Sequence, residues 1–412
     1  MLAWTMAAQP GADKILPVVA DKFVPAEPEG QRLWGPLGDR LKANLQTLLH
    51  VDEAALLAPF EKRPAAEARS GEAVGRFLEA AARTYRYQKE QKLRVLMERV
   101  AKRLLAAQLP DGYLGTSADP GRWKGWDVST HQSNLAGLLA YWRSSGDDRA
   151  LAGARRIGEL LAATFGPDKR DIIAASAQGG LAGTAVLQPI CQLYRATGDA
   201  RFLKFALYLV SAWEQASGPQ LMGSLLSDGH QGAPTPELLR NLIGMLELYR
   251  LTADEKLLRA AMAAQQDLAG SAPGGAWVEF NWHLLRLTGD PHFAAQVQKT
   301  ELVEAHDVAL LPQLVAGVLA GGVAIQLYEP GTFKIPGGKP LRFEVSHAKT
   351  TEDTPVIRVT LVEGEGRFPL WLRVPEGGFT VLAGGRKYVG RPGRYLMIDR
   401  QWATGDTAEW PR

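Results

Sequence analysis

The sequence has only one cysteine, Cys191, among its 412 residues. A single cysteine permits neither an internal disulfide nor a cysteine-rich metal site. Cys191 lies in the apolar stretch Pro189–Tyr194, where a small buried hydrophobe is the expected role. The chain also lacks any run of about eighteen apolar residues, so it is not expected to span a membrane.

The chain also lacks a large excess of either charge, because its 47 Lys and Arg residues nearly balance its 44 Asp and Glu residues. No basic stripe interleaved with aromatic residues occurs, which argues against nucleic acid as a partner. Aromatic residues are plentiful, with 11 Trp, 10 Tyr and 12 Phe. Sugar rings stack on aromatic side chains, so this supply suits a carbohydrate-binding cleft, although most such residues pack into cores.

A phrase close to Leu-Tyr-Arg-x-Thr-Gly-Asp occurs four times, at Tyr141–Asp147, Leu193–Asp199, Leu248–Asp254 and Leu284–Asp290. Each copy ends one apolar-periodic stretch and precedes another. Gly accepts the left-handed conformation that follows a helix end. Asp caps the next helix by accepting hydrogen bonds from its free N–H groups. The phrase therefore predicts a helical-hairpin corner that is used repeatedly along the chain.

Helical periodicity extends over residues 31–319. The expected helices are 41–57, 72–87 with 91–109, 134–144 with 147–164, 185–196 with 200–214, 236–251 with 255–268, and 277–287 with 291–305. Such an array forms either an open solenoid or a closed toroid. The long loops 110–131, 174–184 and 218–236 favour an (α/α)6 toroid, because binding sites lie on loops at one rim of a rigid scaffold.

From about residue 321 the pattern changes to short alternating stretches separated by turn residues. The fold class is therefore mainly α, with three expected regions: a lead-in segment 1–30, a toroid 31–320 and a small antiparallel β-sandwich 321–412. Leu2–Ala8 resembles the end of a secretory signal, which favours export to the periplasm or the medium. The alternative is an N-terminal tail on a cytoplasmic protein.

Several phrases in order resemble glycoside hydrolase family 127, the β-L-arabinofuranosidase-like proteins. They are Gln108–Thr116, Trp126–His131, Leu135–Trp142, Leu193–Leu203, Phe368–Pro375 and Arg400–Trp402. The resemblance spans roughly residues 70 to 410. It implies a toroid of six helical hairpins, a β-sandwich and a sugar substrate.

The resemblance breaks at the catalytic centre. Characterised family members use a cysteine nucleophile on zinc, which is held by three Cys and one Glu. Glu279 matches the Glu, but Asn281 stands where the family has a ligand Cys, and residues 307–312 lack the later Cys pair. The loop 269–276, where the family has its acid/base Glu, has no carboxylate. We therefore expect no metal and no cofactor, because Cys191 cannot supply three sulfur ligands.

Glycoside hydrolysis usually needs two carboxylates, about 5–5.5 Å apart for retention and about 6.5–9.5 Å for inversion. Asp127, Asp228 and Glu279 are the candidates for this pair. Each also has a structural alternative, as a helix cap, an ordinary turn residue or a salt-bridged residue. The expected sugar-binding residues are Tyr113, Trp126, His131, His230, Asn281 and Trp282. This hypothesis places Asp127 and Glu279 in one cavity with aromatic walls.

The sequence thus favours a zinc-independent glycosidase that acts on an oligo- or polysaccharide of plant or microbial origin. Two alternatives stay open. One is a catalytically inactive relative that binds a glycan. The other is a lyase or unsaturated-uronide hydrolase on the same toroid, which basic residues converging with His131 or His230 in the cavity would favour. The sequence does not determine the oligomeric state.

Overall fold

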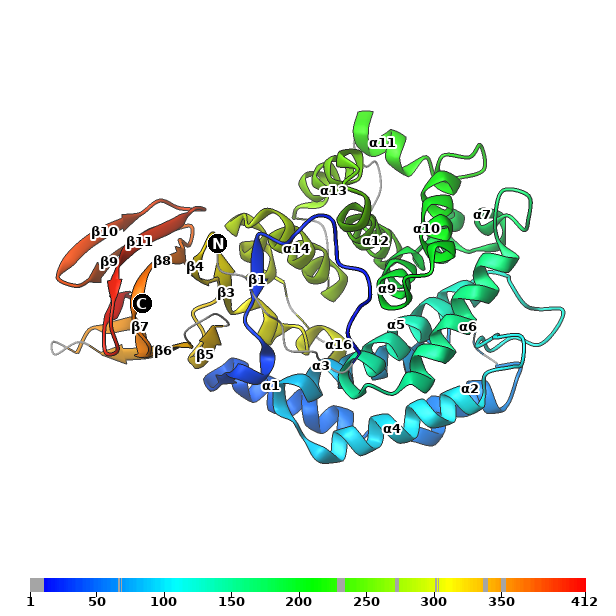
Figure 1. Ribbon diagram of the computed structural model, residues 1–412, viewed down its shortest axis with the longest axis horizontal. Helices are drawn as coiled ribbons and strands as arrows, with labels where there is room; N and C mark the ends of the chain where they lie inside the picture. The colour runs from blue at the N-terminus through cyan, green and yellow to red at the C-terminus, as the bar shows by residue number, and fades with distance from the viewer. Residues whose placement is uncertain are drawn as a thin grey trace.

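A computed structural model describes residues 11–65, 67, 69–227, 234–270, 274–300, 302, 304–335, 340–349 and 353–412. The leader-like segment 2–8 and the candidates Asp228 and His230 lie outside these residues. A ring of helices occupies one part of the molecule and two β-sheets the other (Figure 1). Within the described chain, no helix combines the length and apolar character that a membrane span requires.

Five helical hairpins are present in the described residues. They are α3 (Glu72–Gln88) with α4 (Gln91–Ala106), α5 (Asp127–Ser145) with α6 (Asp148–Thr164), α9 (Leu187–Thr197) with α10 (Ala200–Trp213), α12 (Pro236–Thr252) with α13 (Glu255–Leu268), and α14 (Gly275–Thr288) with α15 (Pro291–Gln298). The first helices of the pairs contact one another in the order α3, α5, α9, α12 and α14. The short α16 (Ala305–Val308) contacts both α14 and α3 and closes the ring. This arrangement confirms the expected toroid of helical hairpins.

Further helices cover the outside and the loops. Helix α1 (Gly35–Leu49) packs on α3, α4 and α16, and α2 (Glu53–Glu61) packs on α4. The short helices α7 (Ile172–Ala175), α8 (Leu181–Thr184) and α11 (Leu221–Ser227) lie in long connections between hairpins. The inner helices α3 and α5 approach very closely, because a Cβ on Gly75 would lie only 2.0 Å from the Ser133 carbonyl oxygen. Glycine at this position therefore sets how the two helices meet.

The repeated phrase forms the corners that the sequence predicts. Helices α5, α9, α12 and α14 all end at a residue in the left-handed region, namely Gly146, Gly198, Ala253 and Gly289. The aspartate that follows caps the next helix through its side chain in every copy, at Asp147, Asp199, Asp254 and Asp290. All four corners lie at the C-terminal ends of inner helices.

An N-terminal strap, residues 11–22, crosses these helix ends (Figure 1). The Arg195 carbonyl accepts hydrogen bonds from the N–H groups of strap residues 14 and 15. The Arg250 carbonyl accepts from residues 18 and 19, and the Arg286 carbonyl accepts from residue 22. The last carbonyls of a helix have no partner within the helix itself. The strap therefore satisfies such groups on three successive inner helices.

Two sheets form the second part. One has the order β1 (Phe23–Pro25), β3 (Ala316–Leu319), β4 (Gly322–Ile325), β8 (Gly366–Arg373), β11 (Tyr395–Trp402). The other has the order β10 (Arg386–Gly390), β9 (Phe379–Ala383), β12 (Thr407–Pro411), β7 (Pro355–Glu363), β6 (Leu341–Lys349), β5 (Gly331–Ile335), β2 (Gln31–Leu33). All neighbouring strands are antiparallel except β4 and β8. The buried side chains Phe343, Leu361, Leu370 and Ile398 contribute to the core of this part.

The strands correct the expected domain boundaries. Residues 23–25 and 31–33, placed by the sequence in the lead-in and the toroid, pair with β3 and β5 as strands of the sheets. Three-residue strands are too short to show an alternating pattern, and their partners lie about 300 residues away. The chain therefore enters the sheet region before it builds the ring.

Candidate active site

The N-terminal ends of the inner helices surround a cavity of about 590 Å³. Its lining comes from the N-terminal halves of α3, α5, α9, α12 and α14, from α16, and from residues just before α3, α14 and α16. The lining residues are Arg69, Glu72, Ala73, Arg76, Glu79, Gln132, Ser133, Ala136, Gln188, Gln192, Pro236, Arg240, Gly274, Gly275, Ala276, Glu279, Glu304, His306 and Asp307. Helix N-termini carry partial positive charge and favour nearby anions. The corners of the repeat lie at the opposite ends of these helices.

Two carboxylates from distant helices meet at one guanidinium. Arg83 Nη2 lies 2.6 Å from Glu79 Oε1 and 2.7 Å from Glu279 Oε1. Because both oxygens bind the same nitrogen, they are at most about 5.3 Å apart. Glu79 and Arg83 are one turn apart on α3, whereas Glu279 comes from the second turn of α14.

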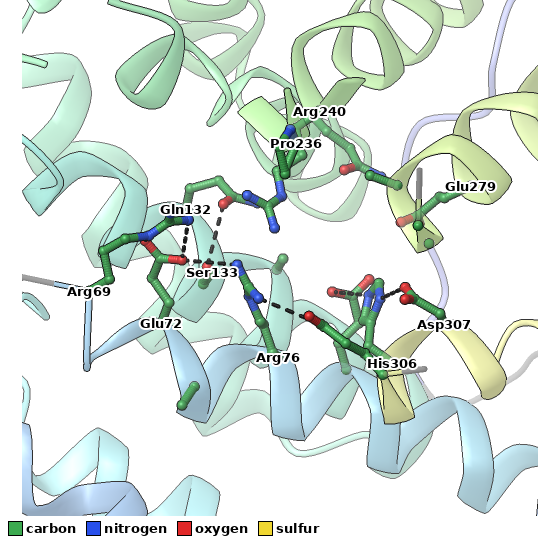
Figure 2. Close-up of a pocket in the computed structure, with 18 of the residues that line it drawn as sticks. Arg69, Glu72, Arg76, Gln132, Ser133, Pro236, Arg240, Glu279, His306 and Asp307 are labelled. Atoms are coloured by element: carbon green, nitrogen blue, oxygen red, sulfur yellow. Dashed lines mark hydrogen bonds and ion pairs between the residues drawn. The ribbon is translucent and has the colours of Figure 1, made fainter. Parts of the chain in front are cut away.

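His306 connects this pair to a third carboxylate (Figure 2). Its Nε2 lies 3.0 Å from Glu79 Oε2, and its Nδ1 lies 3.2 Å from Asp307 Oδ1. Burial and the Arg83 charge lower the pKa of His306, but the Glu79 charge and the hydrogen bonds to Asp307 and Glu79 together outweigh them and raise the pKa to about 9. Burial would raise the pKa of Glu79, but Arg83 and His306 hold it well below its usual range. At neutral pH, His306 is therefore an imidazolium beside an ionised Glu79.

The other side of the cavity is basic. Arg69 lies 2.9 Å from Glu72 Oε1 and 3.0 Å from Glu237 Oε1, and Arg76 Nη2 lies 3.1 Å from Glu72 Oε2. Figure 2 shows Arg240 extending into the cavity between Gln132 and the acidic residues. The cavity therefore has a basic side, on α3 and α12, and an acidic side, on α3, α14 and α16.

Of the candidate residues from the sequence, Glu279 lines the cavity, whereas Asp127 and Tyr113 do not. The Asp127 carboxylate accepts hydrogen bonds from the Tyr113 hydroxyl at 2.7 Å and from the Trp123 N–H at 2.8 Å. Burial and the Asp127 charge raise the pKa of Tyr113, so its hydroxyl stays a donor. Both side chains are buried and satisfied. The expectation that Asp127 and Glu279 share one cavity is therefore wrong.

His131 belongs to the same buried network. Its Nδ1 lies 2.8 Å from the Asp127 carbonyl oxygen, and its Nε2 accepts a hydrogen bond from the Leu114 N–H at 3.1 Å. Burial lowers the pKa of His131, so the ring is neutral, as these two bonds require. The residues that the sequence assigned to a rim site instead anchor the loop before α5.

The remaining candidates also lie outside the cavity lining. Trp126 stacks under the Arg69 guanidinium, whose central carbon lies 4.0 Å from the ring centroid. Trp282 is 2% exposed and packs edge-on against Phe23. Asn281 donates a hydrogen bond to the Trp277 carbonyl and accepts one from Gln265. No Phe, Tyr or Trp is among the described lining residues, so the expected aromatic walls are absent there.

The candidates drawn from the sequence did not include Glu79, Arg83, Arg240, His306 or Asp307. Only the one-turn spacing of Glu79 and Arg83 was a local signal. The partners of Arg83 on α14 and α16 are about 200 residues away, and nothing local indicates that these helices converge.

The residues of this chain do not fit the zinc–thiolate site that the resemblance implies. Cys191 is fully buried on α9, outside the cavity lining, and burial raises the pKa of its thiol well above the usual value. Asn281 is committed to hydrogen bonds within the barrel wall. The described residues hold no group of three or more His, Cys, Asp or Glu arranged to bind a metal. Glu279, the matching ligand position, instead pairs with Arg83.

Comparison with known proteins gives one consistent picture. The profile described as "Beta-L-arabinofuranosidase, GH127 catalytic domain" matches residues 36–271. A non-reducing end β-L-arabinofuranosidase of Bifidobacterium longum subsp. longum is 29% identical over 150 residues, which are 33% of this chain and 22% of that protein. The matched part thus spans about a fifth of the length of that relative.

Solved structures show the same fold. A GH127 β-arabinofuranosidase superposes with a TM-score of 0.76 at 15% identity, over 95% of this chain and 81% of that one. A GH127 β-L-arabinofuranosidase from Geobacillus stearothermophilus T6 superposes with a TM-score of 0.71 at 15% identity, over 92% and 81% of the two chains. Both likenesses concern the arrangement of helices and sheets.

Proposed function

Because the chain belongs to glycoside hydrolase family 127, we propose that it hydrolyses a glycosidic bond in a plant or microbial glycan without a zinc–thiolate centre. The observation that carries the proposal is the meeting of Glu79, Glu279 and His306 around Arg83 inside the cavity. Carboxylates facing each other across a cavity are the usual apparatus of glycoside hydrolysis.

Glu279 is the carboxylate proposed to face the reacting sugar carbon. Its Oε1 is held by Arg83, and Oε2 accepts no hydrogen bond from the described residues. A carboxylate in this position stabilises the positive charge that develops on the sugar ring, or attacks it as a nucleophile. Arg83 keeps the side chain in one orientation, since guanidinium–carboxylate pairs are directional.

His306 is proposed to supply the proton to the departing oxygen. Glu79 cannot do so, because its low pKa keeps it ionised. A proton donor has to carry its proton at the working pH, and a pKa of about 9 meets this condition for His306. Glu79 acts as a positioning residue that holds the imidazolium through Nε2 at 3.0 Å. The proton proposed for the departing oxygen is the one on Nδ1, which gives up its longer 3.2 Å contact with Asp307 on transfer.

A panel of aryl glycosides and oligosaccharides, with an aryl β-L-arabinofuranoside as the first substrate, tests the proposal. We expect turnover that survives treatment with a chelator and the substitution Cys191→Ala. Loss of activity on chelation, with recovery on adding zinc, would show that the site works through a metal after all. Cys191→Ala also controls for thiol chemistry, because this cysteine lies outside the cavity lining.

A glycan-binding protein without hydrolytic activity is the second candidate. It is favoured by Asn281, which stands where the family has a zinc-ligand cysteine. It is also favoured by the ion pairs that Glu79 and Glu279 make with Arg83. The same panel separates the two functions, because this candidate predicts sugar binding by calorimetry with no released product.

The leader-like segment 2–8 motivates a further proposal, that the protein is exported from the cell. Fractionation of cells that produce the full chain would test this proposal.

A further inference from the structure

Arg240 has hydrogen-bond donors that the rest of the described chain leaves free. Its nearest carboxylate oxygen, Glu237 Oε1, is 3.7 Å away, which is too long for a hydrogen bond. No other described residue accepts a hydrogen bond from its guanidinium, which can donate five. The side chain is only 19% exposed, so water reaches it poorly. A guanidinium this deep in a cavity normally has an anionic partner.

Arg76 shares the same side of the cavity and is also incompletely paired. Its Nη2 binds Glu72, but its Nε is buried without a partner in the described chain. Its Nη1 lies 3.6 Å from Glu304, whose side chain is 64% exposed and therefore weakly held. Burial first, and then the charge of Arg76, lowers the pKa of Arg240. Two like charges thus face one cavity without a full set of acceptors.

The local charges do not balance. The guanidinium groups of Arg69, Arg76 and Arg240 share two well-buried carboxylates, Glu72 and Glu237. Glu72 is further occupied by the Ser129 hydroxyl at 2.9 Å. The third carboxylate, Glu304, is 64% exposed and compensates only weakly, so the buried groups on this side keep a net positive charge. The helix N-termini around the cavity add to the same potential.

We propose that Arg76 and Arg240 form a subsite for the carboxylate of an acidic sugar, so that the glycan bound in this cavity carries uronate residues. A planar guanidinium pairs with a carboxylate through two parallel hydrogen bonds, which the free edge of Arg240 can supply. The neutral side chains of Gln132 and Gln188 line the cavity beside them and suit the sugar hydroxyls. The sugar part of this inference rests on the proposed function, whereas the anion part rests on the arginines alone.

The proposed subsite and the acidic residues lie on opposite sides of the cavity, which suggests a different role for each side. Figure 2 places Arg76 and Arg240 on one side and Glu279, His306 and Asp307 on the other. A ring anchored by its carboxylate on the basic side would present another part of the sugar to the acidic side. The basic side then selects the substrate, and the acidic side acts on it.

Calorimetric binding to the full chain tests the subsite, with oligogalacturonides and glucuronate oligosaccharides as probes and their methyl esters as matched neutral ligands. We expect the acids to bind at least about tenfold more tightly than the esters, with an affinity that falls as salt rises. Arg240→Gln should abolish this preference, and Arg240→Lys should keep part of it. Arg155→Gln, on the exposed surface of α6, is the matched control and should change nothing.

Equal affinity for acids and esters, or an unchanged preference in Arg240→Gln, would overturn the subsite. Tighter binding of sulfated or phosphorylated sugars than of uronates would overturn the assignment to a carboxylate. A melting temperature equal to that of the wild type shows that Arg240→Gln is folded, and Arg76→Gln provides a second variant if it is not. These measurements need no turnover, so a failed hydrolysis assay leaves their outcome intact.

Discussion

Asp21 of the strap holds Arg250 of α12 through a carboxylate oxygen 3.0 Å from Nη2. Its second oxygen accepts a hydrogen bond from Arg286 Nε at 2.8 Å. Asp13 does the same for the other two copies of the repeat, 3.0 Å from Arg143 and 2.9 Å from Arg195. The arginine of the repeated phrase therefore joins the inner helices to the strap, at the end of the ring opposite the cavity.

Asp21→Asn should lower the free energy of unfolding by about 2–3 kcal/mol, because the buried Arg250 and the partly buried Arg286 lose a charged acceptor. Urea denaturation measures the change. Asp39→Asn is the control, since its ion pair with Lys42 is 71–72% exposed and should contribute almost nothing. Equal stability of both variants would mean that the strap is dispensable.

Acid should weaken the same contact. Burial alone would raise the pKa of Asp21, but Arg286 and Arg250 outweigh burial and lower it. A carboxyl with a lowered folded-state pKa stabilises the fold above its unfolded-state pKa of about 3.9, and this contribution is lost as the pH falls. The free energy of unfolding, measured from pH 6 to pH 3, should therefore fall more steeply in the wild type than in Asp21→Asn. Parallel curves would contradict the assignment.

Glu279→Gln should reduce turnover by about 100-fold or more, since the amide cannot stabilise positive charge on the sugar. The rate on the best aryl glycoside of the panel measures it, with circular dichroism as the check on folding. Glu61→Gln, in an exposed ion pair with Arg103, is the matched control and should keep full activity. An active Glu279→Gln enzyme would remove this residue from the mechanism.

The pH dependence of turnover should report on His306. Activity should fall as the pH rises through about 9, where the imidazolium loses its proton. In Glu79→Gln this limb should move to lower pH, because the charge that raises the pKa of His306 is gone. Glu304→Gln, at an exposed residue of the same cavity that pairs with Arg76, should leave the limb in place. If activity of Glu79→Gln falls at the same alkaline pH as that of the wild type, His306 is excluded as the proton donor.

Asp127→Asn should affect stability rather than catalysis. The substitution disturbs the buried bonds to Tyr113 and Trp123, which should cost about 1–3 kcal/mol of unfolding free energy. Turnover of the folded fraction should stay within about twofold of the wild type. A loss comparable to that of Glu279→Gln, without loss of stability, would restore Asp127 as a catalytic candidate.

Much of the fold was predictable because its determinants are local. The corner phrase combines a residue that tolerates the left-handed region with an aspartate that caps the next helix, and both act within a few residues. The helical pairs and the change to strands followed from periodicity in the same way. The short strands β1 and β2 were not predictable, because their only support is pairing with β3 and β5 far along the chain.

The site was predictable at one position, Glu279, through its resemblance to a family motif. Asp127 and His131 are residue types that are common in binding sites at a toroid rim. In the structure, however, their polar groups are engaged in buried hydrogen bonds. Sequence cannot distinguish a polar group satisfied by its neighbours from one that faces a cavity. That difference depends on burial, which a residue acquires only when distant helices pack around it.

The sequence by itself thus determined the helical hairpins, their corners and the family, because capping, periodicity and motif order are properties of neighbouring residues. The tertiary structure alone decided which charges meet. Arg83 joins Glu79, four residues before it, to Glu279, 196 residues after it, only because closure of the ring brings α14 and α16 against α3. The chemistry proposed for the cavity follows from that closure.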